Sequence, residues 1–132
     1  MARLALISLV LALAAALGAC GGGDDSKDAQ QAVRDFVEAT NAHDGDRLCG
    51  DLLSQDYLEK YTGATGDRAD DACKQQLTLI TGLKLRLVSI DGTKVDDDSA
   101  TVRATIAMRG ERTPRVFRLV KQDGDWKLDS GS

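Results

Sequence analysis

Two tyrosines and one histidine are the side chains best suited to moving a proton or polarising a ligand. Tyr57 and Tyr61 lie four residues apart, a spacing that puts both rings on one face of a short helix. Their hydroxyls could line a pocket, or the rings could serve as the packing face of that helix. His43 is the one histidine of the chain and follows a predicted helix, so we expect it to be an exposed turn residue.

A catalytic base must point into a pocket, within about 3 Å of the proton that it takes. The inward positions of the best-defined predicted strand carry no acid or base; they are Val102, Ala104, Ile106 and Met108. The acids of that half lie in or beside predicted turns; they are Asp91, Asp96, Asp97 and Asp98. The sequence therefore predicts no catalytic residue.

Five arginines lie within 16 residues, on neighbouring predicted strands. They are Arg103, Arg109, Arg112, Arg115 and Arg118. On one face of a sheet they could receive an acidic protein partner or anionic lipid headgroups. Alternatively, the face is simply solvated and pairs with Glu111 or Asp123.

The chain starts with one basic residue, Arg3, and an uncharged run over residues 4–19. As a helix this run would be about 24 Å long, which is short for a hydrocarbon core of ~30 Å, so it is typical of a secretory signal peptide. Its end, Leu17-Gly18-Ala19-Cys20, resembles the bacterial lipobox, in which the cysteine is lipidated and becomes the first residue of the mature chain. We expect a signal peptide over 1–19, a lipid anchor on Cys20, and a flexible polar tether to residue 27.

The other two cysteines, Cys49 and Cys73, lie on the apolar faces of predicted helices. Disulfides persist in exported proteins, so we predict that this pair staples the second helix to the fourth; two separate buried thiols are the alternative. Two cysteines and one distant histidine fall short of a zinc site with four ligands. We expect no metal and no cofactor.

Four helices are predicted before residue 82. Asp28 is expected to cap the first, whose apolar positions recur every three or four residues up to Thr40. Asp44 or Asp46 caps a second helix, Ser54 caps a short third one through Tyr61, and a last one covers about residues 68–80.

From Leu83 the apolar period changes to two, which indicates strands. Turns are predicted at residues 96–98, 110–114 and 123–124, the last an Asp-Gly pair typical of a hairpin. Four antiparallel strands after four helices predict an α+β protein, with the helices packed on one face of a curved sheet.

The chain of 132 residues has a net charge of −4, which argues against nucleic-acid binding. The charge is uneven: residues 20–82 carry −7 and residues 83–132 carry +2. We therefore expect an acidic helical half and a mildly basic sheet half. A single folded domain over 28–132 fits this length.

Three features together resemble a known family: the first helix ending in the residues of 39–45, the paired cysteines, and the closing run Leu119-Val120-Lys121-Gln122-Asp123-Gly124-Asp125-Trp126-Lys127-Leu128. The chain is similar over about residues 28–129 to small exported lipoproteins of the nuclear transport factor 2-like superfamily, actinobacterial ones above all. The resemblance implies a cone in which helices fill the hollow of the sheet, often around a pocket. Phe36, Tyr57, Tyr61 and Trp126 are the residues that we expect to line it.

That superfamily contains enzymes and proteins that only bind, so the fold does not decide the function. We expect a lipid-anchored domain on the outer side of the cell membrane, non-enzymatic, that binds a protein partner or a small apolar ligand. The alternative is a small enzyme of the isomerase or cyclase type that uses a pocket inside the cone.

Overall fold

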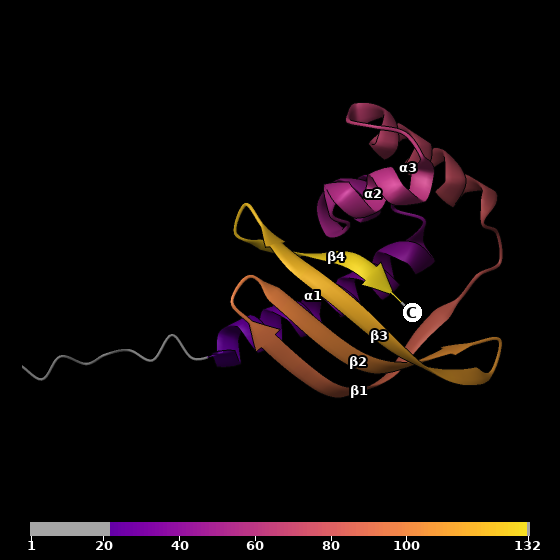
Figure 1. Ribbon diagram of the computed structural model, residues 1–132. Helices are drawn as coiled ribbons and strands as arrows, with labels where there is room; N and C mark the ends of the chain where they lie inside the picture. The colour runs from indigo at the N-terminus through magenta and orange to yellow at the C-terminus, as the bar shows by residue number, and fades with distance from the viewer. Residues whose placement is uncertain (1–21, 132) are drawn as a thin grey trace, which may run out of the picture.

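The computed structural model describes residues 22–131 as helices packed into a four-stranded antiparallel sheet (Figure 1). The helices are α1 (Gly22–Ala42), the π-helix η1 (Asp46–Leu52), α2 (Gln55–Thr62) and α3 (Asp67–Leu79). The strands, neighbours in chain order, are β1 (Leu85–Asp96), β2 (Ser99–Met108), β3 (Glu111–Gln122) and β4 (Asp125–Gly131). The predicted α+β architecture is confirmed.

The molecule is narrow at one end of the sheet and wide at the other, where α2 and α3 lie (Figure 1). The β1–β2 and β3–β4 turns lie at the narrow end together with the start of α1, whereas the β2–β3 turn lies at the wide end (Figure 1). Asp123 and Gly124 both have positive φ, as do Arg109 and Gly110, which is the backbone of a tight two-residue hairpin. The predicted Asp-Gly hairpin is therefore confirmed.

Strand β3 begins earlier than the sequence indicates. Residues 111–114, predicted as a turn, form its first part and pair with β2 up to the turn at Arg109 and Gly110. Strand β4 pairs with β3 only from Phe117 onward, so Pro114 has β2 on one side and no described strand on the other. Proline is tolerated at such an edge, since no partner there needs its missing N–H.

Helix α1 begins at Gly22, six residues before the predicted cap at Asp28. The flexible tether predicted up to residue 27 is therefore wrong for residues 22–27. Asp24 and Asp25 lie in the first turn, where the helix dipole favours acids. Asp25 also pairs with Lys121 of β3 at 2.8 Å, which holds this turn against the sheet.

Two of the predicted caps are present. Asp44 accepts a hydrogen bond from the Arg47 N–H at the start of η1, and Ser54 accepts one from the Tyr57 N–H at the start of α2. Helix η1 is wound more widely than the expected α-helix: Leu53 N–H donates five residues back to the Leu48 carbonyl. Residues 53 and 54 then run beside β4 and bond to Leu128, which covers the outer edge of that strand.

Cys49 of η1 and Cys73 of α3 lie at disulfide distance, with Cα atoms 6.0 Å apart. The pair joins the two helices that the sequence predicts it to join. Both residues are buried.

The core lies between α1 and the inner, concave face of the sheet. Val33 of α1, Val102 of β2 and Leu119 of β3 are its largest fully buried apolar side chains. The buried core residues of the described part of the chain run from Ala29 to Leu128. The predicted signal peptide and Cys20 lie outside the described residues, and none of the described helices is long and apolar enough to cross a membrane.

Candidate functional site

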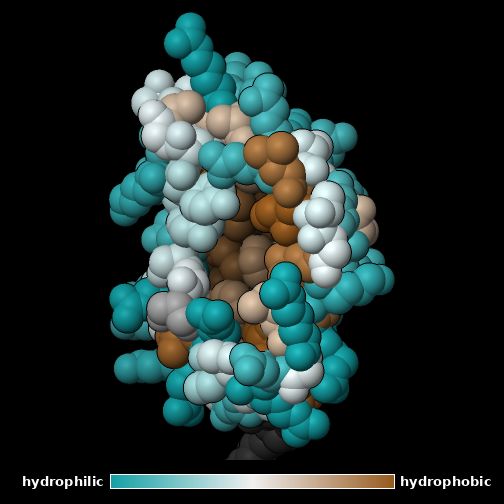
Figure 2. Space-filling model, turned by 90° about the vertical axis from the view of Figure 1, so that its right-hand side faces the viewer, coloured by the Kyte–Doolittle hydropathy of each residue, from teal (hydrophilic) through white to brown (hydrophobic). Residues whose placement is uncertain are grey.

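Two adjoining apolar cavities open at the wide end of the molecule. Figure 2 looks at this end and shows a hollow with apolar walls inside a polar surface. Each cavity has a volume of about 220 Å³. Phe36 of α1, Tyr57 of α2 and Leu85 of β1 line both of them, so the two cavities meet at these three side chains.

One cavity, here the sheet cavity, lies over β2 and β3 and is also lined by Ile106, Met108, Thr113, Arg115 and Phe117. The other, here the helix cavity, lies toward the helices and is also lined by Leu48, Leu53, Tyr61, Leu77, Ile80 and Leu83. Asn41 fixes the rim between them, because its side chain bonds both the N–H and the carbonyl of Leu85 at 2.7 Å.

Tyr57 is placed in the cavities by the Ser54 cap at the start of its helix. It is half-buried, its ring lies 6.1 Å from that of the more exposed Tyr61, and its hydroxyl has no hydrogen-bond partner among the described residues. Burial, with a smaller contribution from Tyr61, raises the pKa of Tyr57 above its ordinary value. The phenol is therefore protonated at neutral pH and can donate a hydrogen bond to a ligand.

Arg115 does not lie on the same face of the sheet as Arg103, Arg112 and Arg118, although the five arginines were expected on one face. It pairs with the buried Ala104 of β2, and residues paired across antiparallel strands share a face. Arg115 thus lies on the concave face and lines the sheet cavity. Counting back two residues from the apolar Phe117 would have shown this, because side chains alternate along a strand.

The outer, convex face keeps three of the five arginines. Arg103, Arg112 and Arg118 lie exposed there, while Arg109 occupies the β2–β3 turn. The Arg103 guanidinium packs over Gly92 of β1, where a Cβ would collide with it.

His43 is exposed in the turn after α1, as expected. Its ring nitrogen Nε2 also lies 2.6 Å from the Ile80 carbonyl at the end of α3. The contact ties together the ends of two helices beside the helix cavity and could not be read from the spacing of the sequence.

Comparison with solved structures identifies the fold. A candidate scytalone dehydratase from Novosphingobium aromaticivorans is 21% identical, with a TM-score of 0.56 over 83% of each chain. The chain has the nuclear transport factor 2-like fold.

Two other matches are more distant. An NTF2-like protein of unknown function from Cytophaga hutchinsonii is 13% identical over 76% of this chain and 86% of its own, with a TM-score of 0.44. A phospholipid-binding protein from Ralstonia solanacearum, solved with a phospholipid, is 13% identical over 81% and 76%, also with a TM-score of 0.44. No protein-family model and no curated protein sequence matches the chain.

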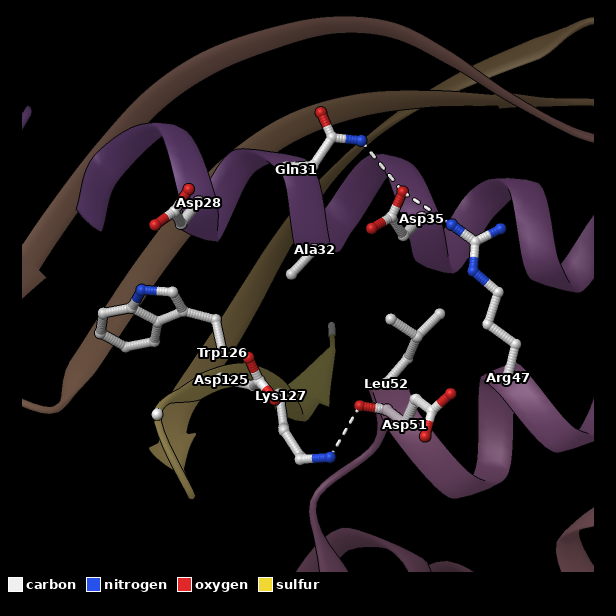
Figure 3. A pocket seen from close by; sticks show the side chains of 11 residues that line it. Asp28, Gln31, Ala32, Asp35, Arg47, Asp51, Leu52, Asp125, Trp126 and Lys127 are labelled. Carbon is white, nitrogen blue, oxygen red and sulfur yellow. Dashed lines mark hydrogen bonds and ion pairs between the residues drawn. The ribbon is translucent and has the colours of Figure 1, made fainter. Parts of the chain in front are cut away.

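A second, polar cleft of about 550 Å³ lies on the nuclear transport factor 2-like cone, between α1, η1 and β4 (Figure 3). Several of its side chains hold the neighbouring elements together: Asp35 pairs with Arg47 at 3.0 Å and accepts from Gln31, and Lys127 donates to the backbone carbonyl of Asp51. These contacts join the three elements, so we interpret the cleft as a structural network.

Trp126 lines this polar cleft and neither of the apolar cavities, contrary to expectation. It is buried near the narrow end of the cone, with Lys121 Nζ 5.4 Å from the ring centroid. Of the four predicted pocket residues, the structure brings together Phe36, Tyr57 and Tyr61. Within residues 22–131 no three potential metal ligands lie close enough to hold an ion.

Proposed function

We propose that this protein is a binding protein for a small, mainly apolar ligand, carried outside the cytoplasm on a lipid anchor at Cys20. The observation that carries the proposal is the pair of adjoining apolar cavities, which share Phe36, Tyr57 and Leu85. Ligand sites are commonly concave and apolar, with a few polar groups that set orientation. Tyr57, Thr113 and Arg115 supply such groups here.

The driving force would be removal of apolar surface from water, about 25 cal/mol for each Å² buried. The rim adds exposed apolar side chains that a ligand would cover, since Met108 is 39% exposed and Tyr61 is 54% exposed.

A small enzyme of the isomerase or cyclase type is the second candidate function. The Tyr57 hydroxyl favours it, because a protonated phenol inside an apolar cavity can polarise a carbonyl. No carboxylate or imidazole lines either apolar cavity among the described residues, so a proton acceptor would have to come from the ligand. An enzyme would change the mass or stereochemistry of a captured ligand during incubation; a binding protein would return it unchanged.

Binding of the neutral fluorescent probe N-phenyl-1-naphthylamine tests the cavity. Leu85→Trp fills the junction of the two cavities and should raise the Kd for the probe at least tenfold. Leu79→Trp is the matched control, because Leu79 is 81% exposed and lines neither cavity. Met108→Trp, at the mouth of the sheet cavity, serves if the first variant fails to fold. No binding by the unaltered protein would reject the proposal.

Cell fractionation tests the anchor separately. Cys20→Ala removes the thiol that would carry the lipid, so the protein should leave the membrane fraction. Retention of that variant in the membrane would show that the lipobox interpretation is wrong.

A further inference from the structure

Arg115 is the one charged side chain that lines either apolar cavity among the described residues. It is exposed at the mouth, and no carboxylate of residues 22–131 lies within ion-pair distance of it. The nearest acid along its own strand face is Glu111, four residues away. A cation thus stands at the entrance of an apolar site without a protein partner in this part of the chain.

Other basic side chains lie near Arg115 and add to the positive charge at the mouth of the cavities. The strand ends at the wide end carry four further cations, Lys84, Arg86, Arg109 and Arg112, against the two acids Glu111 and Asp129. The described helices contribute only uncharged side chains to the helix cavity, among them Thr40, Tyr61 and Gln76. Such a field would steer anions toward the mouth.

We infer that the cavities take a single-chain anionic amphiphile, with its aliphatic body in the apolar cavities and its acid group at Arg115. This inference rests on the proposed function and names the class of ligand. A guanidinium can donate two parallel hydrogen bonds to a carboxylate or a phosphate. The two cavities of about 220 Å³ each suit one aliphatic chain, and Tyr57 and Thr113 offer hydroxyls beside it.

A cavity lined only by apolar side chains would show the opposite order of affinity. Such a cavity binds an alcohol more tightly than the carboxylate of equal chain length, because the ionised group must lose water without compensation. A preference for the acid is therefore evidence for Arg115 as its partner.

Isothermal titration at pH 7.5 with decanoate, decyl phosphate, decanol and decylamine tests the inference on a chain that begins at Gly21, which contains the whole described core. We expect decanoate or decyl phosphate to bind at least tenfold more tightly than decanol, and decylamine to bind most weakly. The ratio of the two acids shows which head group the site prefers. The advantage of the acids should shrink as salt is raised from 50 to 500 mM, because Arg115 is exposed.

Arg115→Gln should raise the Kd for the acids at least fivefold and leave the Kd for decanol within twofold. Arg118→Gln is the matched control, since Arg118 lies three residues away on the same strand but on the convex face and outside the group of cations at the mouth. Equal binding of decanol and decanoate, tighter binding of decylamine, or acid binding that Arg115→Gln leaves unchanged would each overturn the inference. If the naphthylamine probe still binds in those cases, the proposed function stands; if it does not, both fall.

Discussion

Ser54 makes two side-chain hydrogen bonds that connect α2 with β4. Its side chain is fully buried, accepts from the Tyr57 N–H at 3.1 Å and donates to Asp129 of β4 at 2.6 Å. The hydroxyl therefore starts α2, aims Tyr57 at the cavities and joins the helix to the sheet.

Ser54→Ala should lower the free energy of unfolding by about 2 kcal/mol, from the lost cap and the unpaired Asp129. It should also weaken binding of the naphthylamine probe, because Tyr57 loses its fixed position. Urea unfolding measures the first effect. Ser54→Thr keeps a hydroxyl and should recover most of the stability; an alanine variant as stable as the parent would contradict this role.

Burial of Tyr57 predicts a loss of stability in alkali. Its pKa is raised in the folded state, so above the ordinary value of 10.0 the unfolded chain releases this proton first. The free energy of unfolding must then fall as the pH rises. Urea unfolding between pH 9 and 11 should show a shallower fall for Tyr57→Phe than for the parent.

The parent and Tyr57→Phe both keep the other groups that lower the free energy of unfolding in alkali. The difference between their slopes therefore reports Tyr57 alone. Lys74 and Lys121 have pKa values raised by their hydrogen bonds to Asp70, Asp46 and Asp25, and both variants keep them. Equal slopes for the two proteins would show that the Tyr57 phenol is as well solvated when folded as when unfolded.

At the scale of elements, the cysteine pair holds together the least regular part of the fold. It joins η1 to α3 across 24 residues of sequence. Helix η1 is a short π-helix, a poor structure by itself. The link fixes the helical wall of the helix cavity, which Cys73 also lines.

Replacing both cysteines by alanine should lower the free energy of unfolding by about 3–4 kcal/mol in the chain-entropy model. For a domain of this size the Tm should fall by more than about 10 °C. Alkylation without reductant, followed by mass spectrometry, should find residues 49 and 73 joined in the parent. Two free thiols there would remove the basis of the prediction.

The elements could be predicted where local signals are strong. The Asp-Gly pair at 123–124 and the serine cap at 54 act through their own neighbours, and both are present as predicted. The start of α1 could not be predicted in this way, because the turn over residues 22–25 is held by Lys121, far away in sequence. Helix-terminal contacts of this kind leave no periodic pattern.

At the scale of the whole molecule, charge is divided in two ways: between the helices and the sheet, and, within the sheet, between its two ends. The expected acidic helices and basic strands are modified by the turns, since Asp96, Asp97, Asp98 and Asp123 of the sheet lie at the narrow end beside Asp24 and Asp25. The wide end of the sheet carries the cations around the cavity mouth. The two ends of the sheet are therefore oppositely charged.

If Cys20 carries the proposed anchor, this axis sets the direction in which the cavities open. Helix α1 begins two residues after Cys20 and is 21 residues long, about 31 Å at 1.5 Å per residue. The narrow end would then face the membrane and the mouth would face away from it. A ligand would enter from the surroundings and not from the bilayer below.

Energy transfer to a labelled lipid tests this orientation. Fluorophores on Asp97→Cys and Arg109→Cys report opposite ends of the molecule from equivalent exposed turn positions with positive φ. In vesicles that hold the lipidated protein, transfer should be strong from residue 97 and weak from residue 109. Equal transfer from the two positions would mean that the domain lies flat on the membrane.

The sequence by itself determined the class of fold, the order of the elements, most turns and the two cysteines that meet. These follow from apolar periodicity and from local backbone preferences, which act over a few residues. Only the tertiary structure decided which side chains share a cavity. Alternation along β3 gives the face of Arg115, but only the register of β2, β3 and β4 places Arg115 at the cavity end of the sheet and Trp126 at the other end. The register and the packing of α1 together fix how far a residue lies from Phe36, which lines both cavities. The spacing of residues along the sequence predicts neither of them.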